Sequence, residues 1–300
     1  MIDNPFVLDI LSQPAAVQRA LENFDSRSLA PLAAALKRGD FDRVILTGMG
    51  ASLYASYPTW LMLASAGIPA LWVDTAELIH HVPGLVTSRT LLWLFSQSGK
   101  SAEIVSALDF ERIRRPAALL AAVNDLGSPL AQAATSFGKP SVYIPIRAEV
   151  EKTVSTRTYI NTLAVSQLGA LALLEKDTES AREALMQTAA RMEEYLSTWK
   201  NRVERLGEQI GFPKRLAILG RGPSMAAVCT GTLILAEAAK FMAAPFQAGE
   251  FRHGPLELAN PDLTVLLFAG PPETRDLNWP LLKELRSYGV NAYWIGPDSV

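Results

Sequence analysis

A segment rich in hydroxyl groups lies between residues 96 and 101. It reads Ser96-Gln97-Ser98-Gly99-Lys100-Ser101 and follows the apolar run 91–95. Serine hydroxyls and glycine N–H groups can surround phosphate oxygens, and a helix that begins near Ser101 would point its positive dipole end at the same place. Serines before a helix can also act only as caps. Because three serines and a glycine fall within six residues, this segment, the serine loop, predicts a phosphate-binding site.

Two residues have side chains suited to moving protons. Glu237 lies in the apolar segment 232–239, where a carboxylate is costly to bury. Burial raises the pKa of a carboxyl group toward neutrality, which suits a general base. His253 lies in the loop-like segment Glu250-Phe251-Arg252-His253-Gly254-Pro255, and histidine titrates near neutral pH. The alternatives are a surface glutamate paired with Lys240 and a loop histidine bonded to backbone.

Other polar clusters carry less information. Ser155-Thr156-Arg157-Thr158 precedes the helical segment 159–174 and could present a second hydroxyl cluster to the same ligand, although alone it is an ordinary helix start. Glu77, His80 and His81 lack the further cysteine or carboxylate of a metal site, so we expect no metal. The turn 48–52 lacks the third glycine of a dinucleotide fingerprint, and we expect no cofactor.

The composition limits the class of protein. The chain has 300 residues, 49% of them hydrophobic, and its 28 basic and 30 acidic residues give a net charge of −2. We therefore expect a compact protein that does not bind nucleic acid. The single cysteine, Cys229, indicates a reducing compartment, and we expect it to be a small buried apolar residue. We see no signal peptide and only short apolar runs, so we expect a cytoplasmic protein that does not bind membranes.

Alternating strands and helices must position these residues. The apolar runs 44–46, 91–95, 117–123 and 142–146 predict buried parallel strands, separated by helices such as 53–66. This pattern predicts an α/β fold of doubly wound parallel sheets, an αβα sandwich of the flavodoxin type.

The pattern occurs twice along the chain. Gly48-Met49-Gly50-Ala51-Ser52 is repeated as Gly220-Arg221-Gly222-Pro223-Ser224, and Glu77-Leu78-Ile79-His80 as Glu250-Phe251-Arg252-His253. We infer two tandem units. The expected organisation is N-terminal helices packed on the first unit (1–40), the first unit (41–177), one long connecting helix (178–212) and a second unit (213–300) that lacks its last strand. The second unit also lacks a serine loop, because Ala269-Gly270-Pro271-Pro272 stands in its place.

These motifs, in this order, resemble those of double sugar isomerase (SIS) domain proteins. The similarity covers about residues 43–300 and is greatest to the isomerase half of glucosamine-6-phosphate synthase and to glucosamine-6-phosphate deaminases of the SIS type. The resemblance implies that Ser96, Gln97, Ser98 and Ser101 hold the phosphate of a sugar. It also implies that Ser52 and Ser155 contact the sugar.

The resemblance also assigns the proton-moving residues. It implies that Glu237 shuttles a proton between C1 and C2 of the sugar, and that His253 opens the sugar ring in the site of a partner subunit. Two features differ from the synthase. The chain has Ile2 where the synthase has a catalytic cysteine and carries no glutaminase domain, so we expect no ammonia transfer from glutamine. Ile234 and Ala236 replace helix lysines, and the chain ends before any equivalent of a C-terminal lysine that reaches the sugar.

The expected function is therefore isomerisation of a phosphorylated amino sugar such as glucosamine-6-phosphate, with release of ammonia. A fructosamine-6-phosphate deglycase and a sugar-phosphate-binding regulator without activity are the alternatives. We expect a homodimer with shared active sites, and the apolar run 241–246 beside His253 is the candidate interface.

Overall fold

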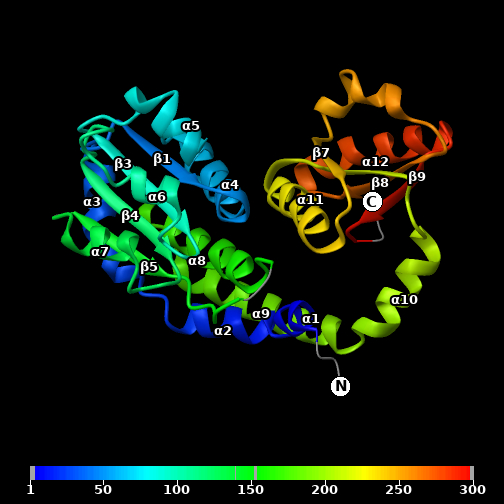
Figure 1. Cartoon of the computed structure of the whole chain (residues 1–300), viewed down its shortest axis with the longest axis horizontal. Coiled ribbons are helices and arrows are strands. Elements are labelled where there is room, and N and C mark those ends of the chain that lie inside the picture. Colours follow the sequence, from blue (N-terminus) through cyan, green and yellow to red (C-terminus); the bar gives the residue numbers. More distant parts are fainter. Residues whose placement is uncertain (1–3, 139, 152–153, 298–300) are drawn as a thin grey trace. The chain divides into compact units, whose positions relative to one another are not determined.

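The computed structural model describes residues 4–138, 140–151 and 154–297. It has two compact units, divided between residues 194 and 195, and each is built on its own parallel sheet. The expected α/β class of two tandem, doubly wound units is therefore confirmed (Figure 1).

The first sheet has five parallel strands in the order β2-β1-β3-β4-β5. This order makes the chain wind first one way and then the other, so that helices cover both faces. Its strands are β1 (Arg43–Gly48), β2 (Ala70–Asp74), β3 (Thr90–Ser96), β4 (Ala118–Val123) and β5 (Ser141–Pro145).

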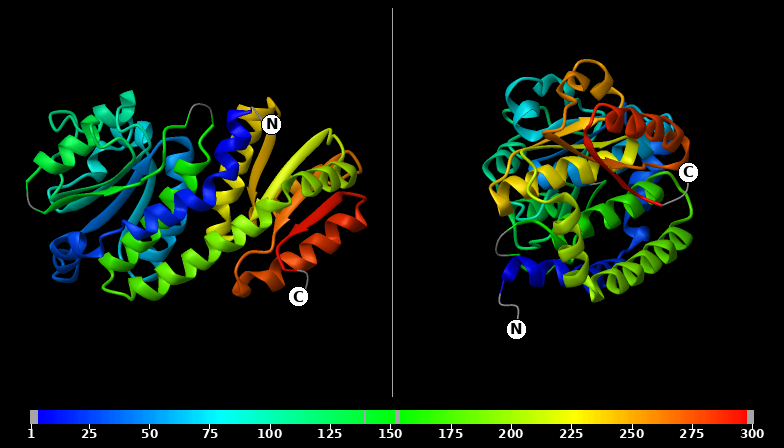
Figure 2. Two further views of the ribbon diagram at one scale, coloured as in Figure 1. Left: turned by 90° about the horizontal axis from the view of Figure 1, so that it is seen from below. Right: turned by 90° about the vertical axis from the view of Figure 1, so that its right-hand side faces the viewer.

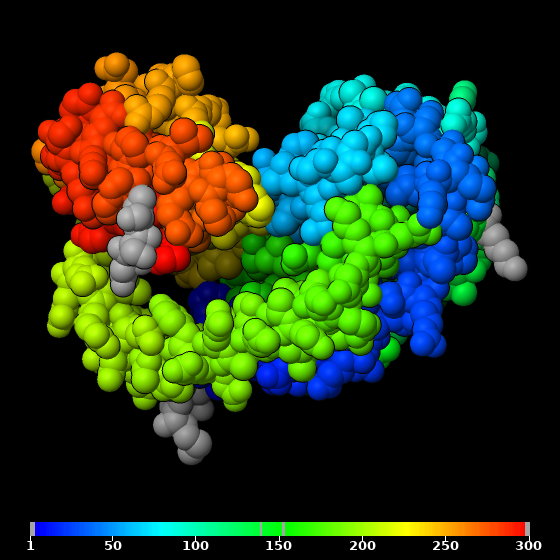
Figure 3. Space-filling model, turned by 180° about the vertical axis from the view of Figure 1, so that it is seen from behind, coloured from blue at the N-terminus to red at the C-terminus, as the bar shows by residue number. Residues whose placement is uncertain are grey.

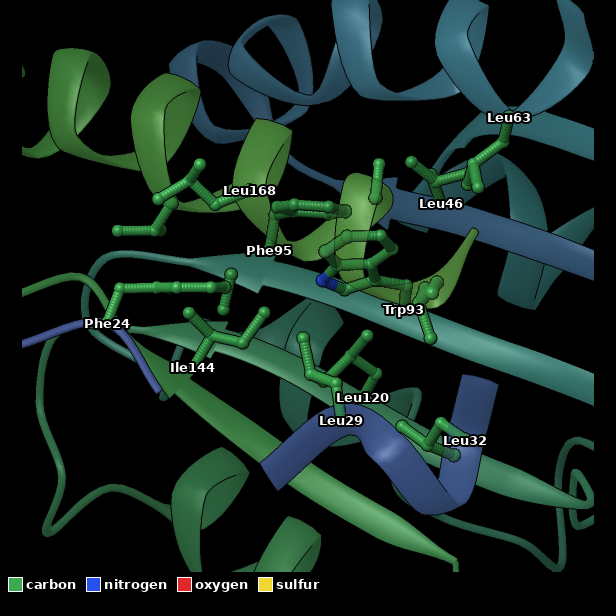
Figure 4. Close-up of a cluster of buried hydrophobic side chains, with 14 of the residues drawn as sticks. Phe24, Leu29, Leu32, Leu46, Leu63, Trp93, Phe95, Leu120, Ile144 and Leu168 are labelled. Atoms are coloured by element: carbon green, nitrogen blue, oxygen red, sulfur yellow. The ribbon is translucent and has the colours of Figure 1, made fainter. Parts of the chain in front are cut away.

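Alternate side chains of the central strands enter two separate cores. Leu46, Trp93, Phe95 and Leu120 face the larger core, in which the rings of Trp93 and Phe95 stack 5.1 Å apart (Figure 4). The helices around this core are α2 (Gln13–Glu22), α3 (Ala30–Lys37), α4 (Gly50–Ser65) and α8 (Arg157–Leu173). The opposite face is covered by α5 (Thr75–His80), α6 (Ala102–Ser106) and α7 (Pro129–Ser136). Each fully buried leucine contributes on the order of 2 kcal/mol to folding.

Terminal segments of the first unit complete the larger core. The chain begins with α1 (Pro5–Leu11), and the short 3-10 helix η1 (Ser26–Leu29) precedes α3. Helix α9 (Thr178–Ser197) buries Ala189 in this core, and Arg182 Nη2 donates to the carbonyl of Phe24 at 3.2 Å. Figures 2 and 3 show α9 beside the N-terminal helices on the outside of the first unit.

The expected single connecting helix is wrong. Helix α9 ends at Ser197 and α10 (Trp199–Ile210) begins after Thr198, whose backbone leaves the helical region. Arg202 Nε donates to Thr198 Oγ1 and to the carbonyl of Tyr195 at this break, and so satisfies a carbonyl that a continuous helix would pair internally.

The second sheet has four parallel strands, in the order β7-β6-β8-β9, over the described residues. Helix α12 (Pro272–Ser287) packs on one face through Leu281, Leu282 and Leu285, and α11 (Met225–Ala239) connects β6 to β7. The strands are β6 (Arg215–Gly220), β7 (Ala243–Gln247), β8 (Leu263–Phe268) and β9 (Asn291–Ile295), with short 3-10 helices η3 (Gly222–Ser224), η4 (Glu250–Arg252) and η5 (Pro255–Leu258).

Helix α11 is unusually apolar. In the described part of the chain, Gly222–Ala239 is the one helical segment whose length and composition would allow it to cross a membrane, and 22% of it is buried. The expectation that every apolar run is too short does not hold for this segment. Its role as the crossover between two parallel strands accounts for the apolar side that faces the sheet.

Candidate functional site

The serine loop is a compact turn at the end of the fully buried strand β3. Ser96 Oγ accepts a hydrogen bond from the Gly99 N–H at 2.9 Å, and the Gln97 carbonyl accepts from Asn124 and Asp125. Ser96 is only 6% exposed, so its hydroxyl shapes the turn. Gln97, Ser98 and Ser101 are half-buried and remain accessible to a ligand.

Gly99 is the residue that the turn requires. Its φ of +64° is in the left-handed region, and a Cβ atom there would lie 2.1 Å from Ser128 Oγ and 2.9 Å from a methyl group of Val123. Every other amino acid would clash with this wall.

The helix after the serine loop is shorter than the sequence suggests. Helix α6 has five residues, so its dipole adds little to anion binding. Ser101 is its N-cap residue but makes no capping hydrogen bond with its side chain. The Ser101 side chain therefore does not serve as a helix cap, and its hydroxyl is available to a ligand.

Ser52 lies beside the serine loop in the sheet order. It is half-buried in the first turn of α4, directly after β1, and β1 pairs with β3 through Gly48 and Phe95. Because the carboxyl ends of parallel strands meet at one edge, Ser52 and the serine loop share the edge at which open α/β sheets bind ligands.

Ser155 reaches the same edge from the start of α8. The buried Asn161 fixes the beginning of α8, since its Nδ2 donates to the carbonyls of Ile146, just after β5, and of Ala16, both at 3.0 Å. The Ser155 hydroxyl lies 2.7 Å from that of Thr158. The first unit thus brings Ser52, the serine loop and Ser155 to one edge of one sheet.

Glu237 is exposed, so the predicted burial of this carboxylate is wrong. It lies in the last turn of α11, beyond the part of that helix that the sheet covers. Lys240 Nζ donates to the Glu237 carbonyl at 2.9 Å and not to its carboxylate. The carboxylate therefore projects from the second unit without the expected apolar surroundings.

His253 is exposed and follows η4, at the carboxyl edge of the second sheet. The backbone N–H of His253 donates to the Glu250 carbonyl at 2.8 Å. Helix α11 runs antiparallel to the strands, so Glu237, near the end of this helix, lies toward the amino edge of the second sheet. Strand β7 separates Glu237 from His253 along the chain and spans about 16 Å. The second unit does not bring Glu237 and His253 together.

An arginine that the sequence analysis did not single out lies at the carboxyl edge of the second sheet. Arg221 Nε donates to Asn278 Oδ1 at 2.7 Å, and the fully buried Asn278 donates to the carbonyls of Phe268 and Ala269. Burial, and then the charge of Arg252, lower the pKa of the Arg221 guanidinium. In the sequence, the Gly-Arg-Gly turn at residues 220–222 could have pointed to this arginine.

Two cavities of the first unit lie elsewhere. One of about 420 Å³ follows the outer edge of β5 beside Phe24, Tyr143 and Arg147, and one of about 320 Å³ lies between Thr87 and Arg112. None of the predicted site residues lines either cavity. Among the described residues, no three histidine, cysteine or acidic side chains are grouped as a metal site would require. Cys229 is half-buried, which raises the pKa of its thiol.

The model of the SIS domain family matches residues 40–172 and 212–296. These two matches include most of the chain and correspond to its two parallel-sheet units. The chain therefore belongs to the SIS domain family, and the expected family is confirmed.

Similar proteins can be named within this family. The chain is 28% identical over 296 residues to the isomerizing glutamine–fructose-6-phosphate aminotransferase of Yersinia pseudotuberculosis, with 95% of this chain and 48% of the relative covered. The corresponding protein of Pyrococcus horikoshii is 24% identical over 295 residues, with 97% and 48% covered. This chain thus spans about half the length of these relatives.

Solved structures show the same fold. Tagatose-6-phosphate ketose/aldose isomerase from Escherichia coli superposes with a TM-score of 0.83 at 24% identity, over 99% of this chain and 82% of that one. Glucosamine-6-phosphate deaminase from Thermotoga maritima superposes with a TM-score of 0.74 at 19% identity, over 98% and 85%. At these identities the likeness concerns the fold alone.

Proposed function

We propose that the chain is a sugar-phosphate isomerase that acts on an amino-sugar phosphate such as glucosamine-6-phosphate and releases ammonia. The observation that carries this proposal is the serine loop, whose Gly99 turn leaves Gln97, Ser98 and Ser101 accessible at the ligand-binding edge of an SIS sheet. Hydroxyl and backbone N–H groups at such an edge suit a phosphate. The names of the relatives support the substrate class.

In the proposed reaction, each residue has one task. The serine loop holds the phosphate, and Ser52 and Ser155 contact the sugar. His253 moves the proton of the C1 hydroxyl to the ring oxygen, which opens the ring. Glu237 removes the proton from C2 while the C1 oxygen takes up a proton, which gives an enolamine. Glu237 then returns its proton to C1 while the amino nitrogen gives up a proton, which gives an imine at C2. Water then adds to this C2=N bond and ammonia leaves, which gives the ketose phosphate.

A homodimer with shared active sites is part of the proposal. Glu237 and His253 lie toward opposite edges of the second sheet, so one copy of this unit cannot direct both at one sugar. The expected interface run 241–246 overlaps the edge strand β7 and includes Met242, which is 90% exposed, and the exposed Pro245. Pro245 has no backbone N–H and so offers a second strand no hydrogen-bond donor at this position, which favours side-chain packing as the contact between the copies.

Replacement of Glu237 tests the proposed chemistry. We expect Glu237→Gln to lower kcat for ammonia release from glucosamine-6-phosphate by about 10²- to 10⁴-fold, because the amide cannot accept the C2 proton. Glu208→Gln, on the exposed face of α10, is the matched control and should keep full activity. Full turnover by the Glu237 variant on glucosamine-6-phosphate and on every related sugar phosphate would remove Glu237 from the mechanism.

Two other functions are the alternatives to this proposal, and a particular feature of the chain favours the second. A fructosamine-6-phosphate deglycase would use the same proton shuttle and release an amino acid, and a panel of substrates distinguishes it. A regulator that binds sugar phosphates without turnover is favoured by the exposed Glu237 and by Ile234 and Ala236 in place of lysines. Calorimetric binding of sugar phosphates without any product would support the regulator.

A further inference from the structure

The amino end of α8 is closed by a carboxylate from the same chain. Glu151 Oε1 accepts from the Thr156 N–H and hydroxyl, both at 2.7 Å, and from the Arg157 N–H at 2.5 Å. Glu151 Oε2 accepts from the Thr158 N–H at 3.1 Å and from the Thr158 hydroxyl. Helix α8 has 17 residues, so its first N–H groups and its dipole favour a negative charge at this point.

These contacts fix the direction of the next hydrogen bond. A hydroxyl has one proton to donate and two lone pairs to accept with, and a carboxylate only accepts. Since Thr158 Oγ1 gives its proton to Glu151, it can only accept from Ser155 at 2.7 Å. The Ser155 hydroxyl therefore donates its proton to Thr158. Toward a ligand it can act only as a hydrogen-bond acceptor, through its lone pairs.

Ser155 is also the group of this cluster that a ligand can reach. Thr156 and Thr158 are 2% and 1% exposed, whereas Ser155 is half-buried. The other hydroxyls of the cluster serve Glu151 and cannot contribute to binding.

The Ser155 segment is tied to the serine loop. The Asn124 N–H donates to the Gln97 carbonyl at 3.2 Å, and Asn124 Oδ1 accepts from the Ala148 N–H at 2.8 Å. Arg157 Nη2 in turn donates to the Val150 carbonyl at 3.1 Å. These hydrogen bonds link the serine loop, through Asn124, to residues 148–150, and link residue 150 to the start of α8, which follows Ser155.

We propose that Ser155 recognises a hydrogen-bond donor of the sugar, a hydroxyl or amino group, and not the phosphate, and that Glu151 is the positioning residue that enforces this polarity through Thr158. The proposal rests on the proposed binding of a sugar phosphate but not on turnover. It adds to the proposed sugar contact of Ser155 the direction of that hydrogen bond and the residue that sets it.

Calorimetric titration with glucosamine-6-phosphate and with inorganic phosphate tests the proposal. We expect Ser155→Ala to weaken binding of glucosamine-6-phosphate about two- to tenfold, which corresponds to the loss of one hydrogen bond. Binding of inorganic phosphate should stay unchanged. The exposed Ser136→Ala on α7 is the control and should change neither affinity. An equal loss for both probes, or no loss for either, would overturn the proposal.

A matched pair at Thr158 tests the relay separately. Thr158→Ser keeps the hydroxyl and should bind glucosamine-6-phosphate like the wild type. Thr158→Val keeps the volume but removes the acceptor, so it should show the loss seen for Ser155→Ala while remaining folded by thermal unfolding. Equal affinities of the Ser and Val variants would exclude the relay. If the wild-type chain binds neither probe, the proposed function itself fails together with this inference.

Discussion

Gly99 shows how a single residue determines the shape of the candidate phosphate site. Its left-handed backbone turns the chain back so that the Gly99 N–H reaches Ser96 Oγ, and Ser128 and Val123 occupy the space where a side chain would lie. The hydroxyls of Ser98 and Ser101 depend on this turn for their position. The residue therefore affects both stability and binding.

We expect Gly99→Ala to lower the free energy of unfolding of the first unit by about 2–4 kcal/mol, from left-handed strain and from overlap with Ser128. It should also raise KM for the sugar phosphate. Gly67→Ala is the matched control, because Gly67 also has a positive φ, +81°, but faces open space. It should cost only about 1 kcal/mol and leave KM unchanged. Chemical denaturation and steady-state kinetics measure both effects, and equal losses for the two variants would show that the wall behind Gly99 is unimportant.

At the scale of secondary structure elements, a buried ion pair fastens α8 to the N-terminal helices. Arg157 is 5% exposed, and its guanidinium lies 2.8 Å from Asp9 of α1 and 2.9 Å from Glu149. Asp9 is itself 9% exposed. Loss of the arginine would leave this carboxylate buried without a partner.

We expect Arg157→Met to destabilise the first unit by about 3–5 kcal/mol, since removing one partner of a buried pair leaves a buried charge. Arg19→Met breaks an exposed pair with Glu149 and should change stability by at most about 1 kcal/mol. The double variant Asp9→Leu with Arg157→Met should recover much of the loss. Thermal unfolding of the two single variants and the double variant measures these stabilities. An Arg157 variant as stable as the Arg19 variant would contradict this account.

The elements also show what the sequence could predict. Buried central strands such as β3 and β4 are continuous apolar runs and were predicted. Strands β2, β7 and β9 were not predicted. They lie at sheet edges with side chains that are largely half-buried or exposed, which weakens the apolar signal, although the edge strand β5 was predicted from the run 142–146. The serine loop was predicted from its local motif. Glu151 and Asn124 were not, because they act through hydrogen bonds that only the folded chain creates.

At the scale of the whole molecule, two copies of the chain are proposed to share their sites. The separation of Glu237 from His253 within one unit supports this arrangement. The half-buried Leu233, Ile234 and Leu235 of α11 and the exposed Met242 before β7 form a candidate contact surface. One chain would then supply the serine loop and another the histidine.

Mixed dimers test the sharing of sites. Ser98→Ala and His253→Ala chains, each inactive alone, should regain about a quarter of wild-type activity after refolding together, because half of the randomly formed dimers contain one intact site of two. Differently tagged chains confirm that mixed dimers form. No recovery in proven mixed dimers would mean that His253 acts within its own chain or has no role.

Exchange of the C2 proton with solvent tests the central claim most directly. Glucosamine-6-phosphate and fructose-6-phosphate are incubated with the wild-type chain in deuterated water, and proton NMR follows the signals at C1 and C2. A proton shuttle predicts deuterium incorporation at these carbons that Glu237→Gln abolishes, while the C3 to C6 signals stay unchanged. Bound sugar phosphate without any exchange at C1 or C2, across amino and neutral sugars, would contradict the account.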